Sequence, residues 1–292
     1  MRKWFSCLVL AVSAFIVAGQ TQEQIPADLA AMADTERAFA KAATVKGWRD
    51  AFLEFFADAA IAFVPEVTSA KDRLRKQPDT PFSVFELVWE PRTGDVASSG
   101  DIGWLTGPST SINHTSPDKK PRYGCYLSVW RKQPDGTWRV FIDVGADSPE
   151  PVPFAPGFNR IALPSRYAGK DDPAKAKQLL AAADVDLNTQ MPTVGVAKAF
   201  AVALTPAARL HRQGYVPIVG SEAIASWLGQ HSSSGTASQK DAHVSSAGDF
   251  GFTHGMFEVS APTPMKGVYV RLWSRDAAGK WWLVVDVAQN QK

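Results

Sequence analysis

Two stretches of the chain alternate apolar and polar residues in nearly the same order. They are "YGCYLSVWRKQPDGTWRVFIDVG" at residues 123–145 and "KGVYVRLWSRDAAGKWWLVVDVA" at residues 266–288. Large apolar side chains at alternate positions favour β-strands, and the polar segment in the middle of each stretch favours a turn. Gly136 and Gly279 lie in these turns, where we expect a positive φ. Each stretch is therefore predicted to form a long β-hairpin.

The two hairpins belong to a longer internal repeat. They align without gaps at an offset of 143 residues, and "SSGDIGWLTG" at 98–107 matches "SAGDFGFTHG" at 246–255 at an offset of 148. The segment at 47–60 matches the one at 195–208 at that same offset of 148. A similarity of this extent, in the same order along the chain, predicts a duplicated domain.

The segments before the hairpins favour helices. Residues 27–56, 174–190 and 195–204 are rich in alanine and repeat apolar residues every three or four positions, which is typical of amphipathic helices. In each copy a short strand and a second short helix follow, and further strands then lead to the hairpin. Helices followed by a long antiparallel sheet predict an α+β fold, with the helices covering one face of a curved sheet.

A proline-rich segment separates the two copies. Residues 149–172 are irregular, and because proline fixes φ and lacks an N–H donor, we expect a linker that runs over the surface rather than through a sheet. The predicted domains are residues 26–148 and 173–292. Two domains also agree with the length of 292 residues, at about 150 residues per domain.

The N-terminus has the pattern of a secretory signal. Arg2 and Lys3 precede an apolar run from Trp4 to Ala18, and small residues follow. The run is shorter than the roughly 20 apolar residues of a spanning helix, so we predict a signal peptide over residues 1–19 and a secreted or periplasmic protein without a stable membrane span after cleavage. The alternative is an uncleaved anchor.

The charge of the chain argues against two classes of partner, and its cysteine content argues against a disulfide. Removal of Arg2 and Lys3 from the 31 basic residues leaves as many basic as acidic residues (29), which argues against nucleic acid or an anionic membrane as a partner. Only Cys125 remains in the mature chain, where it is expected to be a small buried hydrophobe; a reactive nucleophile is the minor alternative. The mature chain then contains no internal disulfide.

The common metal and cofactor motifs are absent from the sequence. It contains no HExxH, no paired-cysteine motif, no GxSxG and no glycine loop that would hold a phosphate. Its five histidines, at positions 114, 211, 231, 243 and 254, show no ligand spacing. We therefore expect no zinc site and no cofactor.

The order of elements and two motifs resemble a known superfamily. Helices, then a four-strand meander with "SSGDIGWLTG" and "GCYLSVWRKQPDGTWRVFIDV", are similar to nuclear-transport-factor-2-like (NTF2-like) proteins, in their SnoaL-like, ketosteroid-isomerase-like branch of the DUF4440 type. The second copy keeps "AGDFGFTHG" and "LWSRDAAGKWW" but is otherwise diverged. The resemblance says little about function, because this fold carries isomerases, dehydratases, cyclases and binding modules.

The resemblance implies a cone-shaped barrel with a pocket at its open end, and domains that pair through their sheets. A tandem chain would form such a pair within itself, as a pseudo-dimer; the alternative is a homo-oligomer. The strand at 123–132 fits pairing, because Tyr126 and Trp130 alternate with Cys125, Leu127 and Val129, so both faces are apolar.

Residues shared by both copies include the first catalytic candidates. Asp143 and Asp286 lie in the last strand of each copy, where an acid is costly unless it is paired, solvated or functional. Such an acid could act as a general base and Tyr126 or Tyr269 as the donor to an oxyanion. The alternative is an acid hydrogen-bonded to a neighbouring strand. The shared tryptophans 130, 138, 273 and 281 are expected to pack in the core, and Asp101 and Asp249 to accept backbone hydrogen bonds in a turn.

Residues that differ between the copies are the second group of candidates. Ile102, Trp104 and Thr106 alternate along one strand and correspond to Phe250, Phe252 and His254, and we expect this face to line the cone. His254 is a catalytic candidate because histidine titrates near neutral pH. The candidate ligand-binding residues are Glu86, Trp89, Trp104, Thr106 and Phe252.

Three functions remain open at this point. The first is an exported tandem that binds a small apolar molecule in one or both cones, and the sequence favours it because the residues shared by both copies look more architectural than catalytic. The second is an isomerase, dehydratase or cyclase with an aspartate base. The third is a scaffold whose cones are filled by their own side chains. A buried acid or histidine in a cavity would favour the second function.

Overall fold

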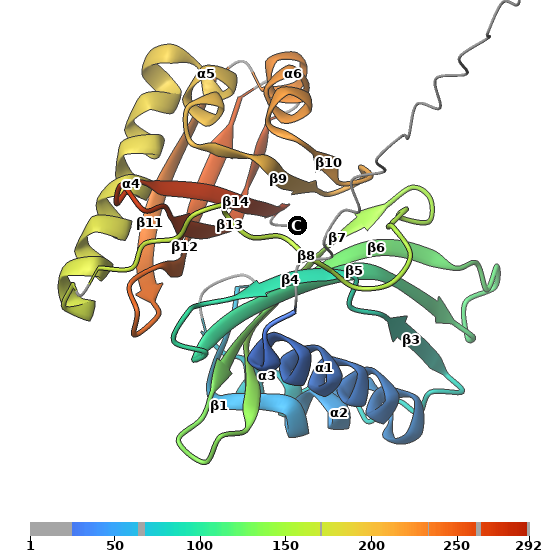
Figure 1. Ribbon diagram of the computed structural model, residues 1–292. Coiled ribbons are helices and arrows are strands. Elements are labelled where there is room, and N and C mark those ends of the chain that lie inside the picture. The colour runs from blue at the N-terminus through green and yellow to red at the C-terminus, as the bar shows by residue number, and fades with distance from the viewer. Residues whose placement is uncertain (1–24, 64–67, 170, 233, 261–263, 291–292) are drawn as a thin grey trace, which may run out of the picture.

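The computed structural model describes residues 25–63, 68–169, 171–232, 234–260 and 264–290 (Figure 1). The predicted signal peptide, residues 1–19, lies outside the described residues. Within those ranges no helix combines the length and the apolar character that a membrane span requires.

The first half forms one mixed sheet with three helices. Its strands lie in the order β2-β1-β7-β6-β5-β4-β8, and β3 pairs with the far part of β5. The strand pairs from β7 to β4 are antiparallel, whereas β1 pairs with β7 in parallel. The elements are α1 (Ala27–Lys46), α2 (Trp48–Phe55), β1 (Phe56–Ala62), β2 (Thr68–Ser69), α3 (Ala70–Arg75), β3 (Phe85–Trp89), β4 (Thr93–Val96), β5 (Ile102–Asn113), β6 (Arg122–Lys132), β7 (Trp138–Ser148) and β8 (Asn159–Arg160).

The second half repeats this arrangement with fewer strands. Its sheet has the order β10-β9-β14-β13-β12-β11, and β9 pairs with β14 in parallel, as β1 does with β7 in the first half. Both predicted hairpins are present, with positive φ at Gly136 (82°) and Gly279 (88°). The elements are α4 (Pro173–Val194), α5 (Val196–Ala201), β9 (Leu204–Arg212), β10 (Ile218–Val219), α6 (Ser221–His231), β11 (Gly235–Val244), β12 (Phe250–Val259), β13 (Met265–Arg275) and β14 (Trp281–Asn290).

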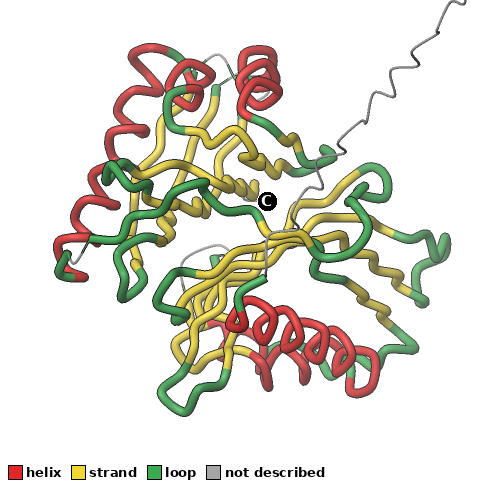
Figure 2. Tube along the Cα trace, viewed as in Figure 1, coloured by secondary structure: helices red, strands yellow, loops and turns green. Residues whose placement is uncertain are grey.

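The two sheets lie between the two groups of helices (Figure 2). One face of each sheet packs against its own helices, and the other face packs against the other sheet. One apolar cluster joins the inner faces and draws on both halves. Its buried members include Trp104, Leu127 and Val129 from the first sheet and Phe252 and Val270 from the second. The predicted mixed α+β class is therefore confirmed, and the apolar character of both faces of β6 has a structural reason.

The shared tryptophans pack between sheet and helices, as predicted. Trp130 and Trp138 are buried with Phe39 of α1 in the core of the first half. Trp273 and Trp281 occupy the matching core of the second half. These side chains therefore build the fold.

Asp101 and Asp249 connect the two halves in a reciprocal way. The backbone N–H of Ser246 donates to Asp101 Oδ2 at 2.9 Å, and the backbone N–H of Ser98 donates to Asp249 Oδ2 at 2.9 Å. Both acids accept backbone hydrogen bonds, as expected. The donor in each of these two bonds belongs to the other copy, so the bonds join the halves. Matched contacts of this kind are typical of an interface with two-fold symmetry.

The prediction that residues 149–172 run only over the surface is wrong. β8 in this segment pairs in parallel with β4 and extends the edge of the first sheet. Arg160 Nε lies 2.9 Å from Asp95 Oδ1, and Arg166 pairs with both Asp95 and Asp249. A buried carboxylate needs a cationic partner, and the linker supplies two arginines to Asp95.

Candidate functional site

A β-bulge places the acid of each last strand on the helix side of its sheet. In β7, Trp138 and Val140 face the helices, whereas Phe141 and Ile142 both belong to the core between the sheets. The register shifts at this point, so Asp143 lies opposite Ser128. β14 has an equivalent shift before Asp286. Strict alternation would have placed Asp143 with Phe141, and the extra residue reverses the faces.

Glu36 of α1 is the anchor of the polar cluster in the first half. Its side chain is fully buried and accepts three hydrogen bonds, from Trp89 Nε1 (2.6 Å), Ser128 Oγ (2.6 Å) and Trp130 Nε1 (2.9 Å). Burial raises the pKa of Glu36, and the three donors act in the opposite direction. No motif in the sequence points to Glu36; the available signal is an acid at a position of α1 that the helical spacing places among apolar residues.

Asp143 lies beside this cluster without a partner. It is half-buried, and no described residue donates a hydrogen bond or forms an ion pair with its carboxyl group. Burial raises the pKa of Asp143 well above its ordinary value, and the negative charge of Glu36 raises it further. The surroundings of this carboxyl group therefore favour its protonated form.

Tyr126 completes the cluster. It lies two residues before Ser128 on the same face of β6, its exposed fraction is 6%, and its buried hydroxyl has no hydrogen-bond partner among the described residues. Burial raises its pKa well above the ordinary value, and the charges of Glu36 and Asp143 add to this effect. The phenol remains protonated, so a hydrogen-bond donor faces the site without an acceptor.

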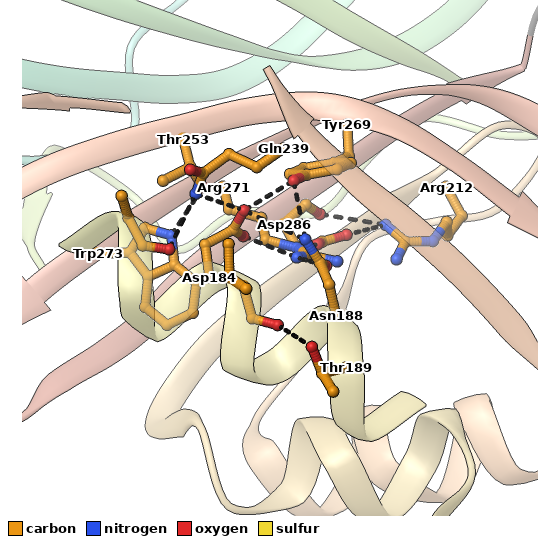
Figure 3. Close-up of polar contacts among 12 residues, drawn as sticks. Asp184, Asn188, Thr189, Arg212, Gln239, Thr253, Tyr269, Arg271, Trp273 and Asp286 are labelled. Atoms are coloured by element: carbon orange, nitrogen blue, oxygen red, sulfur yellow. Dashed lines mark hydrogen bonds and ion pairs between the residues drawn. The ribbon is translucent and has the colours of Figure 1, made fainter. Parts of the chain in front are cut away.

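The second half contains the same framework with two added cations (Figure 3). Asp184 of α4 takes the place of Glu36, and Arg271 takes the place of Ser128. Arg271 Nε donates to Asp286 Oδ2 at 2.8 Å, and its Nη1 donates to Asp184 Oδ1 at 2.7 Å. Arg212 pairs with Asp286 Oδ1 at 2.5 Å. Two arginines thus neutralise two carboxylates.

The tyrosine of the second half also has partners. The Tyr269 hydroxyl donates to Asp184 Oδ2 at 2.7 Å and accepts from Asn188 Nδ2 at 3.2 Å (Figure 3). Burial opposes ionisation of Asp286, but the charges of Arg212 and Arg271 outweigh it and lower the pKa of this carboxyl group. The polar cluster of the second half is therefore a closed ion-pair network. Asp286 matches the alternative in which the acid is paired and structural.

The space beside this network is small. A cavity of about 30 Å³ is lined by Tyr269, Arg271, Asp286 and apolar side chains such as Phe200. About two water molecules fit in such a volume, whereas pockets for small molecules usually measure roughly 300–1,000 Å³.

The prediction that the face of Ile102, Trp104 and Thr106 lines the cone is wrong. Trp104 and Phe252 lie in the core between the sheets. His254 faces the first half, with its ring centroid 5.2 Å from that of Phe63. The Thr106 hydroxyl donates a hydrogen bond to the Tyr126 backbone carbonyl. Pairing of the sheets has turned this face toward the other half.

The two candidates on β3 lie on opposite faces. Trp89 contacts Glu36 and stacks edge-on against Phe39, with ring centroids 4.8 Å apart, so it borders the polar cluster. Glu86 is instead paired with His114, with 3.2 Å between Oε2 and Nε2. Only Trp89 of this pair is brought to the site.

Cys125 is a buried free thiol, as predicted. Burial raises its pKa to about 11, so the thiol stays neutral. Its sulfur lies 3.4 Å from Thr106 Oγ1, in the region between the halves.

The structure also brings together metal-binding side chains that the spacing of histidines in the sequence did not reveal. Asp241, His243 and His254 lie on the neighbouring strands β11 and β12, and one donor atom from each lies within 4.8 Å of the other two. They lie on the inner face of the second sheet, away from Asp286.

No family model and no curated protein matches the sequence. Solved structures similar to this one include a ketosteroid isomerase-like protein from Erwinia carotovora atroseptica, with 17% identity, a TM-score of 0.36, and coverage of 40% of this chain and 98% of that chain. Another is an NTF2-like family protein from Streptomyces avermitilis, with 15% identity, a TM-score of 0.34, and coverage of 40% and 97%. Each similarity spans about the length of one half of this chain.

Proposed function

We propose that the chain is a tandem of two NTF2-like cones, paired through their sheets, in which the first half transfers protons on a small molecule and the second half is a non-catalytic partner. The reciprocal contacts of Asp101 and Asp249 and the shared order of elements support the tandem. Its export, as proposed from residues 1–19, rests on the sequence pattern alone.

One difference between the polar clusters of the two halves supports the catalytic proposal. In the second half every polar group of the framework is paired, because Arg271 and Arg212 neutralise Asp184 and Asp286. In the first half the buried Tyr126 hydroxyl has no partner in the described part of the chain. Buried polar groups are normally hydrogen-bonded, and exceptions concentrate at functional sites.

The proposed chemistry is proton abstraction next to a carbonyl group. Asp143 takes the proton from carbon, the C–H electron pair forms the enolate double bond, and the Tyr126 hydroxyl donates to the enolate oxygen. Return of the proton to a different carbon gives isomerisation, and loss of a β-hydroxyl group gives dehydration. Glu36 acts as a positioning residue, since it fixes Ser128 and its charge adds to the burial that raises the pKa of Asp143.

Binding without turnover is the second candidate function. The partly exposed Trp89 borders Glu36 and packs on the aromatic core at Phe39, and an aromatic side chain in this place suits contact with a small apolar molecule. This function would need Tyr126 as a hydrogen-bond donor but would not need proton exchange by Asp143.

The test is exchange of α-protons for deuterium in a panel of cyclic and aromatic ketones in D2O, followed by proton NMR. We expect enzyme-dependent exchange on at least one ketone. Asp143→Asn should lower the rate by about 100-fold or more, the usual size of a general-base contribution. Tyr126→Phe should lower it by about 100-fold, as removal of one oxyanion donor does.

The matched control is Tyr269→Phe, the same change at the equivalent position of the second half. It should leave the exchange rate unchanged, because Tyr269 bonds only within the closed network. Binding of a ketone without any exchange would replace the catalytic function by the binding function. Equal losses in Tyr126→Phe and Tyr269→Phe would contradict the assignment of the site to the first half.

A further inference from the structure

We propose that Asp241, His243 and His254 form a binding site for one divalent transition metal ion, with zinc as the ion that fits best. The site lies on the inner face of the second sheet, opposite Phe141 of the first half. It shares no residue with the clusters around Asp143 and Asp286, and the inference therefore does not depend on the proposed proton transfer.

Strand pairing brings the three side chains to one face. His254 of β12 lies directly opposite Asp241 of β11, and His243 follows two residues after Asp241. Asp241 Oδ2 and His243 Nε2 are 3.4 Å apart. Donor atoms on a tetrahedral zinc with bonds of about 2.0–2.1 Å lie roughly 3.3 Å apart. Two of the donors already have this separation, and the third lies within 4.8 Å.

His254 provides an independent indication of a ligand. Its exposed fraction is 3%, and its Nδ1 is buried without a hydrogen-bond partner in the described residues. Its ring is nearly parallel to that of His243, with centroids 6.0 Å apart and an interplanar angle of 16°. A buried imidazole with an unpaired nitrogen is costly, and coordination to a cation would give this ring a partner.

The charges around Asp241, His243 and His254 allow this site to bind a cation with moderate affinity. Lys177 Nζ binds the other carboxylate oxygen of Asp241, Oδ1, at 2.9 Å, so Oδ2 remains available to the metal. Lys177 is 48% exposed and can extend into solvent. The Arg131 guanidinium lies 3.8 Å from the centroid of the Phe141 ring and faces the same region. Its positive charge opposes a metal ion, so we expect micromolar rather than nanomolar binding.

The ligand set selects the metal. Two imidazoles and one carboxylate suit zinc, cobalt and nickel, whereas magnesium and calcium require oxygen ligands. Three protein ligands leave a fourth position for water or another small ligand. The site is thus a three-ligand site open at one position.

The test uses the full mature chain without an affinity tag, titrated with Co2+ and followed by visible absorption. We expect one equivalent of Co2+ to give the intense d–d bands of a four- or five-coordinate site, and Zn2+ to abolish them. His243→Ala and Asp241→Asn should each weaken binding by more than about tenfold. Both positions are partly exposed, so these variants should fold, which far-UV circular dichroism checks.

The matched controls are His114→Ala and His231→Ala, which lie outside the cluster and should bind Co2+ like the unchanged protein. The proposal is overturned if the unchanged protein binds Co2+ no more tightly than His243→Ala. It is also overturned if His231→Ala loses binding to the same extent, because the metal would then be held elsewhere.

Discussion

Asp143 and Asp286 occupy equivalent positions, yet their pKa values move in opposite directions. Burial is the largest influence on both. The second half adds Arg271 and Arg212, whose charges favour the ionised form, whereas the first half adds the negative charge of Glu36. Arg212 on β9 has the larger charge effect, and Arg271, which stands where the first half has Ser128, adds to it. The identity of the neighbours, and not the acid itself, decides the direction in which each pKa moves.

This difference predicts opposite effects of asparagine on stability. The raised pKa of Asp143 means that the folded state holds a proton that the unfolded state loses above the ordinary aspartate pKa, so stability falls as pH rises through that value. Asp143→Asn should therefore increase the free energy of unfolding at pH 7.5 by about 1 kcal/mol. The gain should shrink as pH falls and disappear below the ordinary aspartate pKa, where the carboxyl group is protonated in both states. Urea unfolding at the two pH values measures it.

Asp286→Asn is the matched control for this prediction. The lowered pKa of Asp286 contributes stability above the ordinary aspartate pKa, and that stability is lost as pH falls through the folded value. The substitution removes the carboxylate that pairs with Arg212 and leaves Arg271 with Asp184 alone, and it should cost about 3–5 kcal/mol at pH 7.5. A loss of stability in Asp143→Asn at pH 7.5 would contradict the unpaired state of that carboxyl group.

The last hairpin of each half combines a bulge with a turn that requires positive φ. The turns require positive φ at Gly136 and Gly279. The bulges then reverse the faces of β7 and β14, so that each acid points to the helices rather than into the core between the sheets. An acid in that apolar core would be unpaired, so the bulge is part of what makes an acid tolerable in this strand.

The turn predicts a conformational cost that is separate from packing. A Cβ at Gly136 would meet no atom within 4 Å, so only the φ of 82° opposes a larger residue. Gly136→Ala should lower the free energy of unfolding by about 1 kcal/mol, and Gly136→Asn by less, because asparagine tolerates positive φ. Thermal and urea unfolding of the two variants measure the difference. Equal losses for both residues would argue against φ as the cause.

At the scale of the whole molecule, the two sheets share one apolar core. Members of that core come from β5, β6 and β7 and from β12, β13 and β14. Reciprocal hydrogen bonds of Asp101 and Asp249 close one side of this contact, and the linker arginines at 160 and 166 reach into it. Each half would expose an apolar sheet face without the other, so the halves are expected to stabilise one another.

Separate expression of the halves tests this dependence. Residues 26–148 and 173–292 should each aggregate or form oligomers alone, and should combine into a one-to-one complex when refolded together. The full mature chain should unfold in a single cooperative transition. Size-exclusion chromatography and calorimetry measure these properties. A stable monomer from either half alone would contradict the shared core.

Local patterns in the sequence determined the elements of this protein. Alternation predicted the hairpins, helical spacing predicted the alanine-rich helices, and the offsets of 143 and 148 residues indicated that two copies share one order. These properties are local, because side-chain period and glycine φ depend on a few neighbouring residues. The acids at 143 and 286 and the tyrosines at 126 and 269 were found in this way, because both copies repeat them.

Only the tertiary structure decided how these residues are used. The bulges turned the acids toward the helices, and α1 supplied Glu36, which lies 92 positions before its partner Ser128 in the chain. Pairing of the sheets turned Trp104 and Phe252 away from the expected pocket, and the register of β11 with β12 brought His243 and His254 together. Register and long-range pairing depend on the sum of many contacts, so a single sequence without its fold does not specify them.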